Sequence, residues 1–260
     1  MTEDILLSNL NEGVLTLTLN RPKANAFNEA LIKAAQNAFK DAARNAGVRC
    51  VLLTGSGRIF SAGQDVTEFG GEGGGPRSFR AHLQKTYNPL ILAMRALEKP
   101  VIAAINGAVA GAALGIALAA DLRIASDEAR FVVGFGGIGL APDSAVSLML
   151  PLLIGLGRAA EATYFNDPIN AEQALAWGLV NRVVPAAALA EEAAAWAQRL
   201  ADGPTYAMGL AKRDFNRAHL ANLEEMLDYE AHIQEIAGRG PDHKEGLAAF
   251  LEKRTPHYRK

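Results

Sequence analysis

The chain has 260 residues, of which 50% are hydrophobic and 21% are charged. This is ordinary for one large globular domain or for a domain with a helical appendage. Its 26 basic and 28 acidic residues are interspersed and leave a net charge of −2, which argues against a dedicated nucleic-acid surface. The single cysteine, Cys50, excludes an intramolecular disulfide and a cysteine metal cluster. We expect a buried Cys50 and, because the acidic N-terminus lacks a secretory pattern, a cytoplasmic protein.

The first half of the chain alternates between strand and helix patterns. Leucines alternate with threonines after the turn residues Asn11-Glu12-Gly13, which predicts a β-hairpin. Asn28 is a candidate N-cap for a helix running to about residue 45, and a strand is expected at 50–54. Further along we expect a helix over 80–97 and strands over 101–105, 122–125 and 130–133. This alternation predicts an α/β protein with parallel strands and helical crossovers.

The stretch from Pro100 to Ala120 is long enough for a membrane span, because Asn106 is its only strongly polar residue. It consists mostly of Ala and Gly rather than the residues that drive membrane insertion, and Asn106-Gly107 is a turn signal. We therefore expect a soluble helix that packs closely, and no membrane partner.

After about residue 181 the pattern becomes helical, with helices expected over 186–200, 204–213, 223–236 and 244–251. We place the domain boundary between an α/β core, residues 1–200, and a helical region, residues 201–260. The glycine-rich patch at 70–75 lacks a Lys-Ser/Thr partner and is predicted to be a mobile surface loop. It lies in the segment 66–82, which we expect to line the substrate pocket.

Several common catalytic motifs do not fit the chain. Residues 134–139 satisfy G-x-G-x-x-G, but no second strand with an acidic end follows, so nicotinamide binding is not favoured. The chain has neither a G-x-S-x-G elbow nor an H-E-x-x-H motif. The five histidines, at positions 82, 219, 232, 243 and 257, show no metal spacing and are expected on the surface, so no metal is expected.

Two loop-to-helix junctions are rich in small residues, at 60–65 and at 106–113. Small side chains let a ligand approach the backbone, and free N–H groups at helix starts are natural oxyanion donors. Two such donors could stabilise the enolate of a thioester. Close packing of Ala and Gly explains the composition about as well.

These segments resemble the enoyl-CoA hydratase/isomerase (crotonase) superfamily. Phe60-Ser-Ala-Gly-Gln-Asp65 resembles its F-x-A-G-x-D segment, and Lys99 to Gly107 its second signature. Residues 20–26, 171–180 and 245–254 are similar to further motifs in the same order. The resemblance implies a crotonase-type spiral of ββα units with a C-terminal helical oligomerisation region. It also implies a homotrimer or dimer of trimers acting on acyl-coenzyme A, with no separate cofactor.

The resemblance also implies roles for individual residues. The backbone N–H groups of Ala62 and Ala112 would form the oxyanion hole. Coenzyme A would be bound by residues of the small-residue junctions and of the C-terminal region: Ala24, Gly63, Gln64, Asp65, Gly111, Phe250 and Lys253. The last two would reach the coenzyme A of a neighbouring subunit.

The chain departs from the family at the two glutamates that activate water in hydratases, because those positions fall on Gly115 and Phe135. The nearest acid is Asp143, in a segment that resembles double-bond isomerases, particularly the ring-epoxide isomerase of phenylacetyl-CoA breakdown. One carboxylate suffices for a double-bond shift, so we favour an isomerase with Asp143 as base. The resemblance implies a place in fatty acid metabolism or phenylacetate degradation. Alternatives are a helix cap at Asp143, a hydratase (a lyase) with rearranged acids, and a non-catalytic acyl-CoA-binding homologue.

Overall fold

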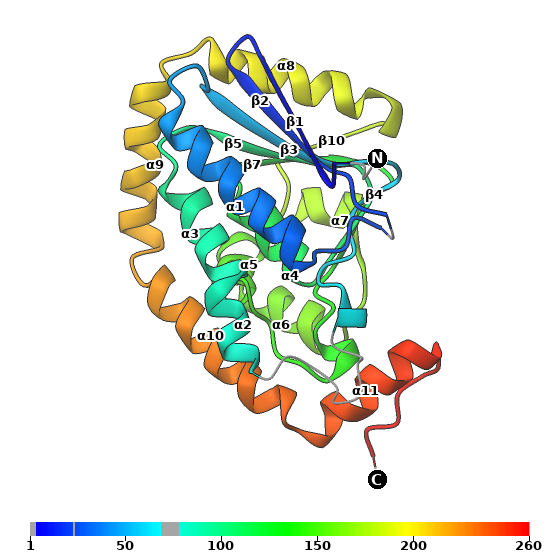
Figure 1. Ribbon diagram of the computed structural model, residues 1–260. Helices are drawn as coiled ribbons and strands as arrows, with labels where there is room; N and C mark the ends of the chain where they lie inside the picture. The colour runs from blue at the N-terminus through cyan, green and yellow to red at the C-terminus, as the bar shows by residue number, and fades with distance from the viewer. Residues whose placement is uncertain (1–3, 23, 69–77, 260) are drawn as a thin grey trace.

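A computed structural model describes residues 4–22, 24–68 and 78–259 (Figure 1). The glycine-rich patch at 70–75 lies outside the described residues. The larger of two sheets has the strand order β1-β2-β3-β5-β7-β10. β1 and β2 form the expected hairpin and the remaining neighbours are parallel. The strands are β1 (Leu6–Asn11), β2 (Val14–Leu19), β3 (Cys50–Gly55), β5 (Val101–Ile105), β7 (Leu122–Ser126) and β10 (Arg182–Val184).

A second sheet has the order β4-β6-β8-β9. Its strands are β4 (Ile59–Ser61), β6 (Ala108–Ala110), β8 (Arg130–Val132) and β9 (Ile169–Asn170). Three consecutive strands of the large sheet, β3, β5 and β7, are each followed directly by a strand of the small one. This repetition of two strands and a helical connection is the predicted ββα arrangement.

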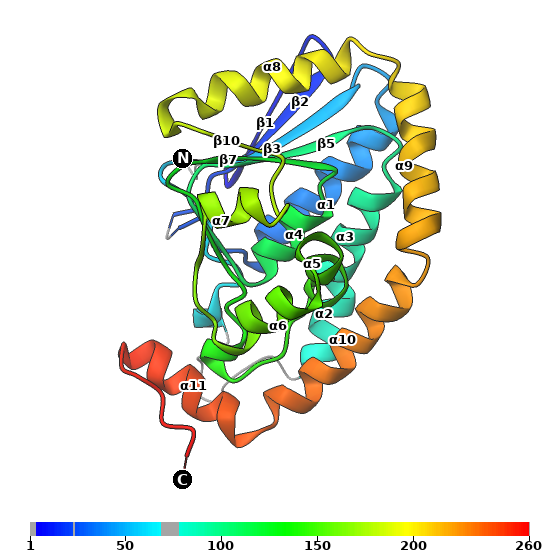
Figure 2. The same ribbon diagram turned by 180° about the vertical axis from the view of Figure 1, so that it is seen from behind.

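Helices cover both faces of the large sheet (Figures 1 and 2). On one face lie α1 (Glu29–Arg44), α3 (Tyr87–Ala96) and α4 (Ala112–Ala119), and on the other lies α8 (Leu189–Ala201), which follows the 3-10 turn η3 (Ala186–Ala188). The side chains of β3 alternate accordingly: Val51 and Leu53 pack toward α1 and α3, whereas Cys50 and Leu52 pack toward α8. The prediction for Cys50 is confirmed, and burial raises the pKa of its thiol to about 12.

The helix expected over 80–97 is two helices, α2 (Phe79–Lys85) and α3, separated at Thr86. Pro89 lies in the first turn of α3. Proline has no N–H to donate to residue 85, and its ring would clash with that carbonyl group if one helix continued. The expected helix start at Asn28 is confirmed, since its side chain accepts a hydrogen bond from the Leu31 amide at 2.9 Å.

The last helices are α9 (Thr205–His219), α10 (Leu223–Gly238) and α11 (Pro241–Glu252), which wrap in one arc around the core (Figures 1 and 2). Between this arc and the sheets lie α5 (Val146–Ile154), α6 (Leu156–Tyr164) and α7 (Ala171–Ala176). The helical tail therefore packs on its own core.

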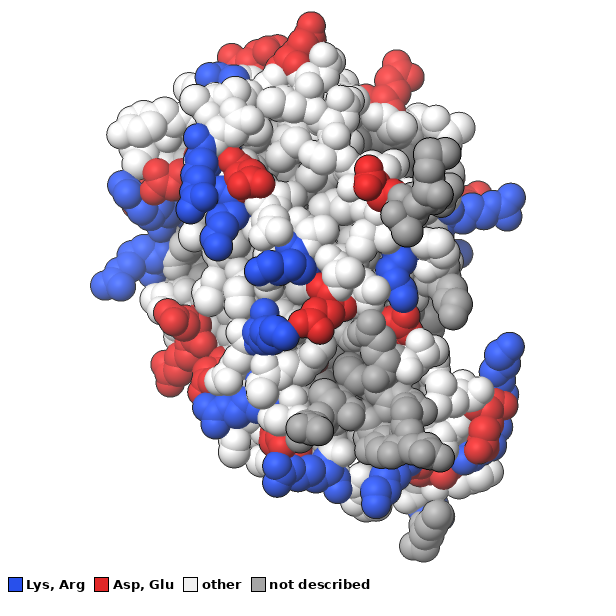
Figure 3. Space-filling model, in the orientation of Figure 1, with Lys and Arg blue, Asp and Glu red and all other residues white. Residues whose placement is uncertain are grey.

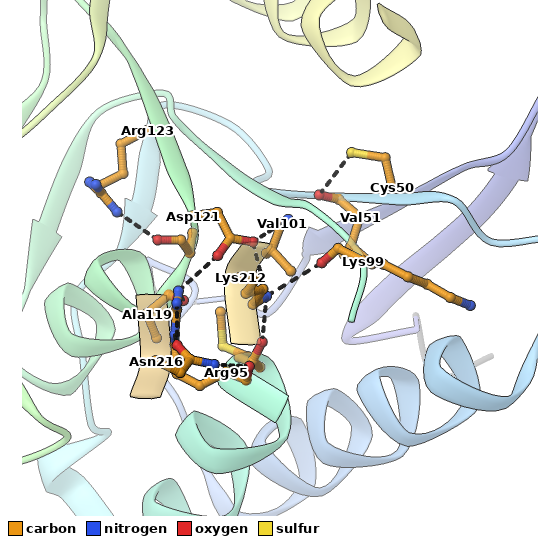
Figure 4. A network of polar contacts seen from close by, with 12 residues as sticks. Cys50, Val51, Arg95, Lys99, Val101, Ala119, Asp121, Arg123, Lys212 and Asn216 are labelled. Atoms are coloured by element: carbon orange, nitrogen blue, oxygen red, sulfur yellow. Dashed lines mark hydrogen bonds and ion pairs between the residues drawn. The ribbon is translucent and has the colours of Figure 1, made fainter. Parts of the chain in front are cut away.

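A buried charge network attaches α9 to the core (Figure 4). Asp121 accepts hydrogen bonds from Arg95 of α3 and Lys212 of α9, both at 2.9 Å, and from the Val101 amide at 2.8 Å. Lys212 also donates to the carbonyl oxygens of Met94 and Lys99. Because three separate elements meet on one carboxylate, the position of α9 is fixed relative to β5 and β7.

The long apolar stretch forms β5, β6 and α4, and none of the helices described could cross a membrane. On the face seen in Figure 3, basic and acidic side chains are interspersed, in agreement with the balanced composition.

Candidate active site

A cavity of about 300 Å³ opens between the N-terminal end of α4, the segment 132–143, α2 and α10. Its wall is mainly apolar, with one carboxylate among the described residues that line it, Asp143. The lining includes residues from both small-residue junctions, Ala62, Gln64, Gly111 and Ala112, and the larger side chains Phe79, Leu83, Tyr87, Phe135, Ile138, Leu140 and Phe250.

The two junctions touch each other at Gly63, which has φ +89°. A Cβ atom there would lie 2.6 Å from the carbonyl oxygen of Ala110, so only glycine allows this approach. Gly111 has φ +56° and turns the chain into α4, so that Ala112 begins the helix beside the cavity. Helix N-termini carry partial positive charge and unsatisfied N–H groups, which suits an oxyanion.

The structure contradicts Ala62 as the second oxyanion donor. The Ala62 N–H donates to the carbonyl oxygen of Ala24 at 3.0 Å, so it is directed into the loop rather than at a ligand. Gln64 lies two residues further on and forms a parallel bridge with Phe27. In that bridge the Gly63 carbonyl and the Asp65 amide face Phe27, so the Gln64 N–H is directed to the opposite side.

Asp65 holds this junction in place. Its carboxylate accepts from Arg21 at 2.7 Å and from the Thr67 hydroxyl at 2.6 Å, and these contacts hold its pKa below the usual value despite the opposing effect of burial. Arg21 also donates to the Ala26 carbonyl oxygen, so its ion pair with the buried Asp65 connects the segment at 62–67 to the loop containing Ala24.

Asp143 is 6% exposed and lines the cavity. It accepts hydrogen bonds from the Ser144 hydroxyl at 2.8 Å and from the Gln234 amide group at 2.7 Å. Burial raises its pKa to about 6, although both hydrogen bonds lower it. A carboxylate in this range is well matched to proton transfer near neutral pH.

The alternative of Asp143 as a helix cap does not hold. The helix begins at Val146, and the Asp143 side chain makes no capping hydrogen bond to the described amides of α5. Glu230 of α10 does this instead, accepting from the amides of Ala145 at 2.7 Å and Ser147 at 3.0 Å. Burial raises the pKa of Glu230 to about 7. Neither Glu230 nor Gln234 was identified from the sequence, where they appear only as polar residues in a helix.

The two positions that align with the hydratase glutamates, Gly115 and Phe135, are both buried. Gly115 is buried in α4 against Ser144, and a Cβ atom at Gly115 would lie 2.7 Å from the Ser144 Cβ. Phe135 is buried and forms part of the apolar cavity wall. No second carboxylate takes over either place among the described lining residues.

The prediction that all five histidines lie on the surface is wrong for two of them. His243 is 2% exposed and contacts the Ile138 carbonyl oxygen at 2.9 Å. His82 is half-buried on the cavity wall, 3.3 Å from the side-chain oxygen of Gln64, and burial lowers its pKa. In the described part of the chain, no group of three metal-ligating side chains gathers.

Phe250 and Lys253 lie at the end of α11. Phe250 lines the cavity of its own chain, although its side chain is largely exposed. Lys253 is exposed and ends α11 in the left-handed conformation, with φ +56°. The single chain therefore brings Phe250 to the site, but not Lys253.

The sequence profile of the enoyl-CoA hydratase/isomerase family matches residues 9–260. The chain belongs to this family. It is 40% identical to 1,2-epoxyphenylacetyl-CoA isomerase of Escherichia coli, covering 98% of each chain. It is 34% identical to crotonyl-CoA hydratase of Syntrophomonas wolfei, again covering 98% of each. Among solved structures it matches an enoyl-CoA hydratase from Mycobacterium avium subsp. paratuberculosis with a TM-score of 0.89, 33% identity and 99% coverage of both chains.

These relatives confirm the crotonase superfamily and its α/β fold. They include proteins named as isomerases and proteins named as hydratases at similar identity. Family membership therefore establishes the class of enzyme and leaves the reaction to be argued from the site.

Proposed function

We propose that this protein is an enoyl-CoA isomerase that moves a double bond from the 3 to the 2 position of an acyl-coenzyme A. The observation that supports this most directly is Asp143, the single carboxylate among the described residues of the cavity wall. A double-bond shift needs one base, whereas addition of water needs an activated water and a proton donor. The steric closure of position 115 by Ser144 also disfavours a hydratase.

The proposed reaction begins with the ionised Asp143 removing a proton from C2 of the 3-enoyl thioester. The C2–H electron pair moves into the conjugated system, and negative charge develops on the thioester oxygen as a dienolate. The N–H group of Ala112, at the start of α4, stabilises that oxygen, with the Gln64 N–H replacing Ala62 as the second candidate donor. Asp143 then returns its proton to C4. The overall reaction is an isomerisation that consumes and releases no water, electron or cofactor.

The backbone of the two junctions would bind the thioester end of coenzyme A. Gly63 and Gly111 allow close approach, and Ala24, Gln64 and the loop held by Asp65 would contact the remainder. The acyl group would occupy the apolar part of the cavity, between Phe135 and Leu140. The 40% identity to a 1,2-epoxyphenylacetyl-CoA isomerase favours a substrate from phenylacetate degradation among acyl-CoA thioesters.

The assembly we propose is a homotrimer or a dimer of trimers in which α9–α11 make the contacts and Phe250 and Lys253 approach the neighbouring subunit. Large apolar side chains on these helices are exposed, namely Tyr206, Phe215, Tyr229, Ile236, Phe250 and Leu251. A trimer interface over these helices would remove this apolar surface from water. Analytical ultracentrifugation at micromolar concentration would exclude this assembly by showing a monomer.

A panel of 3-enoyl-CoA and 2-enoyl-CoA thioesters tests the reaction. Isomerisation converts a 3-enoyl-CoA into the conjugated 2-enoyl-CoA of the same mass. A product of a 2-enoyl-CoA that gains the mass of one water would instead identify a hydratase. Binding without turnover of any thioester would identify an acyl-CoA-binding protein. In D₂O, transfer by one carboxylate predicts that part of the C2 proton is retained at C4.

A further inference from the structure

Two side chains of α10, Glu230 and Gln234, lie one helical turn apart and hold the segment 141–147. Both are buried, with exposures of 3% and 1%. Residues spaced by four lie on one face of a helix, so a single face of α10 presents a carboxylate and an amide to this segment.

The orientation of the Gln234 amide follows from its partners. Its oxygen accepts from the backbone N–H of Ala141 at 3.1 Å. A backbone N–H can only donate, so the nitrogen of Gln234 faces Asp143 and donates to it at 2.7 Å. The Gln234 side chain therefore contacts this segment twice, at the Ala141 amide and at the Asp143 carboxylate.

The segment has an unusual backbone that needs such support. Ser144 and Ala145 have φ +56° and +65°, a conformation that costs residues with a side chain of the order of 1 kcal/mol or more each. Glu230 accepts from the amide of Ala145 and from the amide and hydroxyl of Ser147, immediately after the turn. The turn packs Ser144 onto Gly115 while Asp143 lines the cavity.

We infer that Gln234 is the positioning residue for the carboxylate of Asp143, holding its ionised form toward the cavity, and that Glu230 holds the turn that follows. This rests on the proposed role of Asp143 as the base. Gln234 gives Asp143 an N–H donor that stabilises the negative charge, so it also sets the pH at which Asp143 ionises. Among the described residues, the other titratable groups near Asp143 or on the wall of the same cavity are Glu230, whose charge opposes its ionisation, His82 and Tyr87.

The test is the variant Gln234→Met, which keeps the length of the side chain but has no donor. We expect the Asp143 carboxyl, followed by carbon-13 NMR and assigned by its loss in Asp143→Asn, to titrate about one pH unit higher. The acid limb of kcat should move upward by the same amount. KM should stay within about twofold because Gln234, although it lines the cavity, has its amide oxygen and nitrogen bonded to the Ala141 amide and to Asp143. If Gln234→Met does not fold, Gln234→Glu keeps an acceptor for the Ala141 amide, and its added carboxyl should also raise the titration.

The matched control is Asn88→Leu. Asn88 is a buried amide that donates to the carbonyl oxygen of Leu227 in α10 at 3.1 Å, so it also attaches α10 but has no contact with Asp143. A titration that moves in Gln234→Met and not in Asn88→Leu supports the inference. An unmoved titration in a folded Gln234 variant overturns it, even where turnover depends on Asp143. A moved titration without turnover of any enoyl-CoA would overturn the proposed function alone.

Discussion

The Cβ atom of Ser144 lies 2.7 Å from the position that a Cβ atom would take at Gly115. Ser144, the residue that follows the proposed base, therefore leaves no room for a side chain at position 115, where the resemblance to hydratases would place a glutamate. One turn therefore both brings Asp143 to the cavity and excludes a side chain at position 115.

The variant Gly115→Glu tests this relationship. We expect it to lose stability, because overpacking of a well-packed core costs roughly 1–3 kcal/mol and here the backbone of the turn would have to move. Thermal unfolding should show a lower Tm, and no hydratase activity should appear. Gly157→Ala is the control, because a Cβ atom at this helical glycine meets nothing within 4 Å. A stable Gly115→Glu protein that hydrates a 2-enoyl-CoA would show that position 115 can accommodate a catalytic glutamate.

The variant Asp143→Asn should reduce kcat by about 10²-fold or more, because the amide cannot accept the substrate proton. Folding should persist, since Glu230 and not Asp143 caps α5. In the unmodified protein, kcat should fall as the pH drops below about 6, where Asp143 becomes protonated. Steady-state kinetics against pH would measure both effects. Asp228→Asn, an exposed change on α10, should leave kcat unaltered, and equal rates for the two variants would contradict the assignment of the base.

The variant Ala112→Pro should lower kcat by about 10²-fold or more while leaving the fold intact. Proline is tolerated at the first position of a helix, and it removes the N–H proposed to stabilise the oxyanion. Ala171→Pro is a matched control, because Ala171 is also a buried alanine at the first position of a helix, α7, and lies away from the cavity lining. Circular dichroism would check the folding of both variants and steady-state kinetics their kcat. Full activity in a folded Ala112→Pro protein would contradict the role of the Ala112 N–H as oxyanion donor.

Stability should decrease as the pH rises from about 4 to about 7, the range between the unfolded and folded pKa values of two buried carboxyl groups. The folded-state pKa values of Asp143 and Glu230 are raised from 3.8 to about 6 and from 4.5 to about 7. Between its unfolded and folded pKa values, each group binds more protons in the native state than in the unfolded state. The stability that it contributes is therefore fully present below the unfolded pKa and is lost as the pH rises through the folded pKa. Each group should contribute roughly 1–3 kcal/mol to the change. Urea unfolding at several pH values would measure it, and the double variant Asp143→Asn, Glu230→Gln should flatten the dependence. A pH-independent free energy of unfolding in the original protein would contradict the shifts.

The sequence by itself determined the periodic elements and the two junctions rich in small residues. The alternation in β2, the cap at Asn28 and the strand at 50–54 are local patterns, and the structure confirms them. Gly63 and Gly111 were named through the family resemblance, and the structure adds the reason for glycine: both have positive φ, and Gly63 also approaches the Ala110 carbonyl oxygen closely. The break between α2 and α3 at Thr86 could also have been predicted, because Pro89 cannot continue a helix from α2.

Only the tertiary structure decided which atoms meet at the site. The N–H of Ala62 looked available in the F-x-A-G-x-D segment, but the fold brings the Ala24 carbonyl oxygen to it. Glu230 and Gln234 are separated from Asp143 by 87 and 91 positions, and helical spacing cannot show that they meet one turn. Burial raises the pKa of Asp143 while the hydrogen bond from Gln234 lowers it, and both effects depend on what surrounds the carboxylate in three dimensions.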